Sequence, residues 1–89
     1  MTSPRLFVDF HQRPSDNLDI IHLGAGFTKK CIESQGLKLF SGMRIIVHDG
    51  EIERRAHVSW GRDFFSGVGS SWLAVMVGDY RDCKVENGV

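Results

Sequence analysis

The densest group of side chains suited to binding follows the Asp49-Gly50 step in the middle of the chain. It combines arginines, a histidine and aromatic residues, namely Arg54, Arg55, His57, Trp60, Arg62, Phe64 and Phe65. Arginine presents a planar fork of hydrogen-bond donors, and aromatic rings add large rigid contact area and cation-π capacity, so these residue types dominate binding hot spots. The sequence therefore predicts a partner-binding surface made by these candidate residues.

Two kinds of ligand suit this group. In a protein complex the rings of Phe64 and Phe65 insert into a groove of the partner, whereas on single-stranded nucleic acid they stack on bases while the arginines contact phosphate. A third interpretation places both rings in the mouth of a barrel, with the arginines as a solvated face. The chain carries 11 basic and 11 acidic residues, and a net charge of zero favours protein over nucleic acid or an anionic membrane.

The leading hypothesis is therefore a non-enzymatic protein-binding module, an adaptor or small inhibitor of a larger partner. Self-association of this module as a homo-oligomer is a further hypothesis. A small β-barrel that binds single-stranded nucleic acid is the alternative.

Catalytic and metal chemistry find little support in the sequence. The four histidines, His11, His22, His48 and His57, show no recognised metal-ligand spacing. Cys31 would need an oriented base inside a concave pocket to act as a nucleophile, and a chain of 89 residues leaves little room for a substrate cavity. We therefore expect no enzyme activity, cofactor or metal, and a small hydrolase or metal-binding protein is the distant alternative.

The composition predicts one globular domain over residues 1–89, with a polar tail at 81–89. Hydrophobic residues make up 42% of the chain and charged residues 25%, which is ordinary for a packed protein. No apolar run approaches the roughly 20 residues that span a bilayer, and the first residues lack a signal-peptide pattern, so we expect no membrane association and a cytoplasmic location. Cys31 and Cys83 are too few for a disulfide framework, and free thiols are expected.

The Asp49-Gly50 step also organises the fold, because Asp-Gly between two alternating runs is the strongest short-range hairpin signal. A two-residue turn would pair residues 43–48 with 51–60, setting His48 opposite Glu51 and Arg44 opposite Arg55. The apolar residues of the two strands would then share one core face, namely Met43, Ile45, Val47, Ile52, Ala56, Val58 and Trp60. Like charges across a ladder cost a few tenths of a kcal/mol, so we expect a bulge or a bound anion to relieve that pair.

The other elements follow from local patterns. Alternation predicts strands over 5–11 and 18–23, paired with each other as a hairpin. The apolar run 72–77 is typical of a central strand, and Gly78 to Tyr80 are expected to end it. The one helix is expected over about residues 28–35, with Thr28 as N-cap, Gly36 just beyond its end, and Phe27 and Ile32 lying on the sheet.

Together these elements predict a mainly β fold, either a small SH3-like barrel or a strongly curved antiparallel sheet of five to six strands with one short α-helix. Four segments carry a resemblance: Leu6 to Phe10 (LFVDF), Gln35 to Leu37, Gly42 to Arg44 and Trp72 to Val75 (WLAV). They are similar to a group of small uncharacterised bacterial proteins with an N-terminal FVDF-type strand and a late W-x-A-V strand. That resemblance implies a compact β fold and no known activity.

Overall fold

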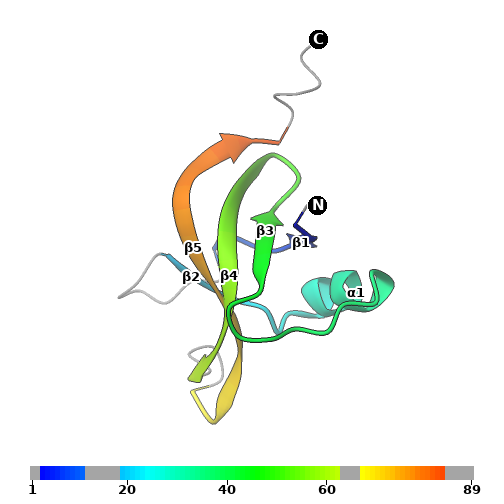
Figure 1. The fold of residues 1–89 in the computed structure, drawn as a ribbon, viewed down its shortest axis with the longest axis vertical. Coiled ribbons are helices and arrows are strands. Elements are labelled where there is room, and N and C mark those ends of the chain that lie inside the picture. Colours follow the sequence, from blue (N-terminus) through cyan, green and yellow to red (C-terminus); the bar gives the residue numbers. More distant parts are fainter. Residues whose placement is uncertain (1–2, 12–18, 63–66, 84–89) are drawn as a thin grey trace.

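Two long central strands dominate the fold, and strands of three residues form its edges (Figure 1). The computed structural model describes residues 3–11, 19–62 and 67–83. Its elements are β1 (Arg5–Phe7), β2 (Ile20–His22), α1 (Gly26–Ser34), β3 (Arg44–His48), β4 (Ile52–Arg62) and β5 (Ser70–Asp82). The strands form one five-stranded sheet in the order β1-β3-β4-β5-β2. A curved, mainly β sheet with one short helix, as predicted, is therefore confirmed.

The predicted pairing of the first two strands with each other is wrong. β1 pairs parallel with β3, where Leu6 lies opposite Val47, and β2 pairs antiparallel with β5, where Ile21 lies opposite Ala74. The sheet is therefore mixed, and in the described part of the chain no ladder joins β1 to β2 to close a barrel. Alternation of apolar residues identifies a strand and its buried face. It does not identify the neighbouring strand, because any strand with an apolar face on the same side of the sheet can pair with it.

The central hairpin is confirmed, but its register differs from the prediction by two residues. His48 lies opposite Glu53 instead of Glu51, because Asp49 folds the connection into a wider loop. Its Oδ1 atom accepts hydrogen bonds from the backbone N–H groups of Glu51 at 2.9 Å and Ile52 at 3.0 Å. Within this loop only Gly50 has a positive φ, of 96°, whereas the predicted type I′ turn needs two residues with positive φ.

The shifted register removes the predicted charge conflict between two arginines. Arg44 lies opposite His57, and Arg55 lies opposite Ile46. A shift of two residues keeps every side chain on its own face, because the side-chain period of a strand is two. The predicted core face of the hairpin therefore survives, with Ile45 and Val58 fully buried.

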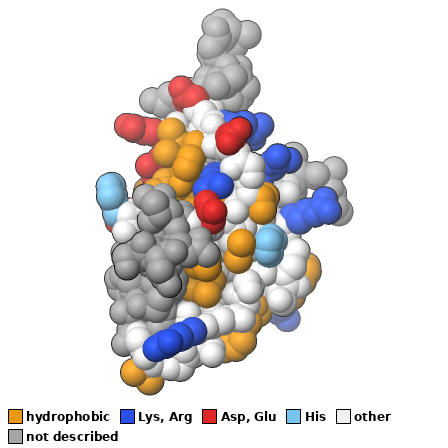
Figure 2. Space-filling view, turned by 90° about the vertical axis from the view of Figure 1, so that its left-hand side faces the viewer, with side chains coloured by type: hydrophobic (Ala, Val, Ile, Leu, Met, Phe, Trp, Pro, Cys, Tyr) orange, Lys and Arg blue, Asp and Glu red, His pale blue; other side chains and the backbone are white. Residues whose placement is uncertain are grey.

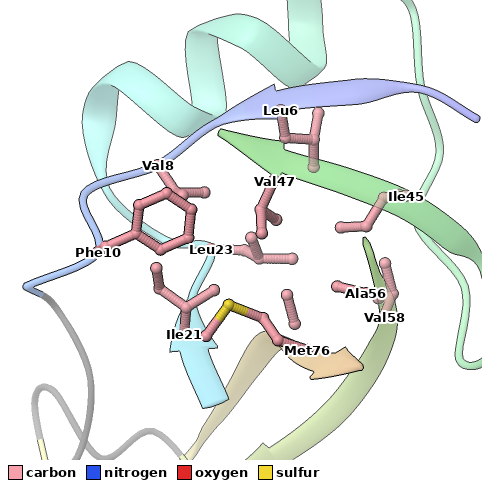
Figure 3. Close-up of a cluster of buried hydrophobic side chains, with 11 residues drawn as sticks. Leu6, Val8, Phe10, Ile21, Leu23, Ile45, Val47, Ala56, Val58 and Met76 are labelled. Atoms are coloured by element: carbon pink, nitrogen blue, oxygen red, sulfur yellow. The ribbon is translucent and has the colours of Figure 1, made fainter. Parts of the chain in front are cut away.

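The core lies on the concave side of the sheet, where side chains from all five strands and their flanking residues converge (Figure 3). The buried hydrophobic cluster consists of Leu6, Val8, Phe10, Ile21, Leu23, Ile45, Val47, Ala56, Val58, Ala74 and Met76. Two residues expected on this face of the hairpin lie outside the cluster, since Ile52 is 37% exposed and Trp60 is 56% exposed. Trp60 extends beyond the end of the core, and this exposure makes it available for contacts.

β5 lies between β4 and β2, in agreement with the predicted central strand, but it is longer than expected. Gly78, predicted to end the strand, has a φ of 70° and sits where the β4–β5 register shifts opposite Glu53 and Arg55. An irregularity of this kind bends a ladder without ending it. Arg81 and Asp82 of the expected tail therefore belong to β5, and residues 84–89 lie outside the described residues.

The predicted helix is confirmed as α1, and Gly36 follows it with a φ of 64°. Ala25 occupies the N-cap position without a side-chain cap, so the assignment of Thr28 as N-cap is wrong. Instead Thr28 is fully buried, and its Oγ1 donates a 2.7 Å hydrogen bond to the carbonyl oxygen of Phe7. This bond ties α1 to β1. In the described ranges, no helix combines the length and the apolar composition needed to cross a membrane.

We expect Thr28→Val to lower the free energy of unfolding by about 1 kcal/mol, the usual net contribution of one hydrogen bond. Valine preserves the shape of threonine but cannot donate to the Phe7 carbonyl. Thr28→Ser, which keeps the hydroxyl and loses a methyl group, is the matched variant. Urea unfolding followed by circular dichroism measures both, and a smaller loss in the valine variant than in the serine variant would contradict a role for the hydrogen bond.

Candidate functional site

The predicted binding residues of β4 divide between the two faces of the sheet. Successive side chains of a strand point to opposite faces, so Arg55 and His57 lie on the face turned away from the core and Trp60 lies on the other. Arg62 is exposed at the end of β4. Phe64 and Phe65 lie outside the described residues. The described candidates therefore do not form one continuous patch.

Arg54 connects three parts of the fold. Its Nε atom donates to the carbonyl oxygen of Gly78 at 2.8 Å, and its Nη1 atom donates to Oδ1 of Asp19 at 2.9 Å. The guanidinium also lies 4.9 Å from the ring centroid of Tyr80, and the side chain is only 13% exposed. These contacts engage Nε, Nη1 and one face of the guanidinium, so Arg54 joins β4 to β5 and to the residue that precedes β2.

The feature best suited to binding is an apolar groove at the far end of β4 and β5. Trp60 and Trp72 lie opposite each other on these strands, with ring centroids 4.9 Å apart and ring planes at 72°. They form one wall of a cavity of about 570 Å³, whose other apolar lining residues are Leu23, Ile32, Leu37 and Leu39. We call this cavity the Trp groove. Its size falls within the usual range for ligand sites.

The groove exists because β3 separates from β4 before β4 ends. Met43 N–H donates to the carbonyl oxygen of Phe40 at 3.1 Å, which closes a turn whose third residue, Gly42, has a φ of 90°. Gly42 N–H also donates to the carbonyl oxygen of Val58 at 2.7 Å. Beyond Val58, β4 and β5 continue as a two-stranded arm (Figure 1), so β3 provides no side chain to cover Trp60.

The rim of the groove carries charges of both signs. Lys29 and Glu33 line it from α1, four residues apart and therefore on the same side of the helix. Elsewhere on the molecule, on the face shown in Figure 2, basic, acidic and hydrophobic side chains are also interspersed. Apolar walls together with the polar residues His22 and Ser71 and a rim of mixed charge can bury an apolar side chain and form hydrogen bonds around it. These are the properties of a protein interface.

The sequence identified Trp60 but not its partner. Trp72 belongs to a run that is apolar at every position, so the pattern could not show which face it occupies. The signal that could have located the groove is the difference in strand length. β4 and β5 have eleven and thirteen residues, whereas β3 has five. Longer strands must extend past their shorter neighbour and expose whatever side chains lie there.

A second cluster of charged groups has a structural role. Glu53 is only 4% exposed, and its carboxylate accepts hydrogen bonds from Arg5 on β1, at 2.8 Å, and from Arg81 on β5. The hydrogen bond from Arg5, reinforced by that from Arg81, holds the pKa of Glu53 below its usual value against the opposing effect of burial. One carboxylate thus joins three strands.

The two thiols are free, as predicted. Burial raises the pKa of the Cys83 thiol, which lies 3.7 Å from Nη2 of Arg5. The Sγ atom of Cys31 lies 3.5 Å from the Arg5 carbonyl oxygen. In the described ranges, no group of three His, Cys, Asp or Glu side chains is placed to hold a metal ion. In comparisons with protein-family models, curated proteins and solved structures, the chain matches none of them.

Proposed function

We propose that this protein is a non-enzymatic protein-binding module that captures a larger protein partner in the Trp groove, as an adaptor or small inhibitor. The observation that carries the proposal is the exposure of Trp60, which leaves 56% of its surface uncovered beside an apolar cavity. Covering a large aromatic side chain stabilises a complex by about 2 kcal/mol. Tryptophan is accordingly enriched among the residues that dominate protein interfaces.

Protein is a better ligand for this groove than single-stranded nucleic acid. Nucleic-acid grooves combine stacking rings with cations that follow the phosphate backbone. Here the rim includes Glu33 beside Lys29, Arg54 is engaged within the fold, and Arg55 lies on the opposite face of the sheet from Trp60. A partner that inserts an apolar side chain between Trp60 and Leu39 meets apolar walls on both sides. A second copy of the chain is one such partner.

We expect Trp60→Ala to abolish partner capture and to cost only about 1 kcal/mol of stability, from the lost edge-to-face contact with Trp72, because most of the ring is exposed in the isolated protein. The experiment is affinity capture from the native cell by the wild-type protein, Trp60→Ala and Phe40→Ala, followed by mass spectrometry. Phe40 is 60% exposed and does not line the groove, so its variant controls for the loss of an exposed aromatic ring. Thermal unfolding of each variant verifies the fold.

The supporting result is a protein bound by the wild type and by Phe40→Ala, but not by Trp60→Ala. Recovery of the same proteins with all three baits would overturn the proposal. Salt dependence tests the alternative ligand, since nucleic-acid binding weakens by orders of magnitude between about 50 and 200 mM salt. An apolar contact through Trp60 changes little over that range. Analytical ultracentrifugation of the wild type and Trp60→Ala identifies the case in which the partner is a second copy.

A further inference from the structure

Three basic side chains converge on the face of the sheet that is turned away from the core. Arg44 of β3 lies directly opposite His57 of β4, and Arg55 precedes His57 by two residues on the same face. Opposite residues of an antiparallel pair have Cβ atoms about 5 Å apart, and alternate residues of a strand are about 7 Å apart. All three residues line one hollow of about 640 Å³, whose other lining residues include Ser3, Gly42 and Val77.

The charges in this hollow are not neutralised within the described part of the chain. No hydrogen bond or ion pair holds Arg44, Arg55 or His57 there, and none of the described lining residues is acidic. Arg5 and Arg81, in contrast, are both engaged with Glu53, the carboxylate closest to Arg55 along this face of β4. Arg5, Arg81 and Glu53 together therefore also carry a net positive charge. The outer face of the hairpin is therefore positive although the whole chain is neutral.

The position of the Arg55 guanidinium depends on the absence of a side chain at Gly78. A Cβ atom added to Gly78 would lie 3.1 Å from Nη2 of Arg55, so the guanidinium lies against the glycine backbone of β5. Val77, next to it in the sequence, is 44% exposed and lines the hollow. The hollow thus combines a basic side, from Arg44, Arg55 and His57, with an apolar side that includes Val77.

We propose that this hollow is a binding site for the phosphate group of a small phosphate ester. Arginine guanidinium groups match phosphate with paired, charge-assisted hydrogen bonds, and the His57 imidazole adds a further donor. The volume lies within the usual 300–1,000 Å³ of a small-molecule site, and Val77 offers apolar contact to the organic part of the ester. No Phe, Tyr or Trp side chain lines the hollow in the described residues, so the large rings on which the bases of a nucleic-acid strand usually stack are missing there. This site is independent of the Trp groove.

The test is an NMR titration of the full-length protein at constant ionic strength with inorganic phosphate and with glycerol 3-phosphate, using chloride as the reference. We expect saturable shifts of the His57 ring and of the Arg44 and Arg55 Nε–H signals with both phosphates, and tighter binding of the ester. Arg44→Gln and Arg55→Gln should each weaken binding at least about tenfold, because a charge-assisted hydrogen bond is worth more than one factor of ten. Both arginines are exposed, so both variants should fold.

Lys30→Gln is the matched control, because it removes the same charge from the exposed surface of α1 and should leave the affinity within about twofold. If Lys30→Gln weakens phosphate binding as much as the arginine variants do, the effect comes from net charge, and the proposed site is wrong. Shifts that do not saturate, or that chloride reproduces, would overturn it as well. A single-stranded oligonucleotide that binds more tightly than the ester, with the same loss in Arg55→Gln, would replace the small ester with nucleic acid as the ligand.

Discussion

Replacing Leu6 with alanine is expected to lower the free energy of unfolding by about 2–5 kcal/mol, the range for a large buried side chain reduced to a methyl group. Leu6 is 0% exposed and lies opposite Val47 in the parallel β1–β3 ladder. β1 has only three residues, so Leu6 provides most of its contact with the core. A domain of this size has about 5–15 kcal/mol of stability in total, and chemical denaturation should show a clearly reduced midpoint.

Phe7→Ala is the matched control, because the neighbouring residue is larger but faces away from the core. Its ring is 40% exposed and contacts Phe27 and His48 edge to face, which is worth about 1 kcal/mol beyond the buried area. We therefore expect a smaller loss than for Leu6→Ala. A loss in Phe7→Ala that equals or exceeds that in Leu6→Ala would show that the orientation of β1 is reversed.

The second large effect is expected from Glu53→Gln. Glutamine keeps the volume and one acceptor but removes the negative charge that pairs with Arg5 and Arg81. Loss of one partner of a fully buried ion pair costs about 3–5 kcal/mol. Because the two arginine side chains are 43% and 62% exposed, water recovers part of that cost, and we expect about 2 kcal/mol at pH 7.

This effect should depend on pH with a definite sign. The pKa of Glu53 lies below the usual 4.5 because Arg5 and Arg81 donate to its carboxylate. A carboxyl group whose pKa is lower in the folded than in the unfolded state stabilises the fold fully above the unfolded pKa. That stability is lost as the pH falls through the folded pKa. The difference between the wild type and Glu53→Gln should therefore be constant from pH 7 to about 5 and shrink on further acidification.

Urea unfolding of both proteins across this range of pH measures the difference directly. Glu51→Gln is the control, because it removes the same charge from an exposed position two residues earlier, and surface substitutions usually stay within about 0.5 kcal/mol. If the difference in the free energy of unfolding persists unchanged at low pH, the loss in Glu53→Gln comes from altered packing and not from the lost ion pairs. If Glu51→Gln loses as much stability as Glu53→Gln, the loss comes from the change in net charge.

The sequence was most informative where the physics is local. Alternation along residues 43–60 depends on neighbouring side chains only, so it predicted the hairpin and the buried faces of Ile45 and Val58. The helix was predicted equally well, since Gly36 marks its end through its own backbone conformation. Even the error in register left these faces correct, because it was a shift of two residues.

Long-range pairing could not be predicted in the same way. Nothing near Arg5 indicates that its guanidinium will meet Glu53, since the two residues become neighbours only through the β1–β3–β4 order of the sheet. Thr28 likewise looked like a helix cap because its true partner, the Phe7 carbonyl, lies 21 residues away. The Trp groove and the phosphate hollow both depend on such distant contacts, so the sequence supplied individual residues and the fold determined which of them meet.

The placement of the two shortest strands has a consequence for how the chain acquires its shape during synthesis. β1 and β2 leave the ribosome early, yet β1 finds its ladder only on β3 and β2 only on β5. Neither can therefore be captured until much later segments have been translated, and closing such long loops slows folding. During that interval the apolar side chains of Leu6 and Ile21 remain uncovered, which is the period when a nascent chain is most susceptible to aggregation or chaperone binding.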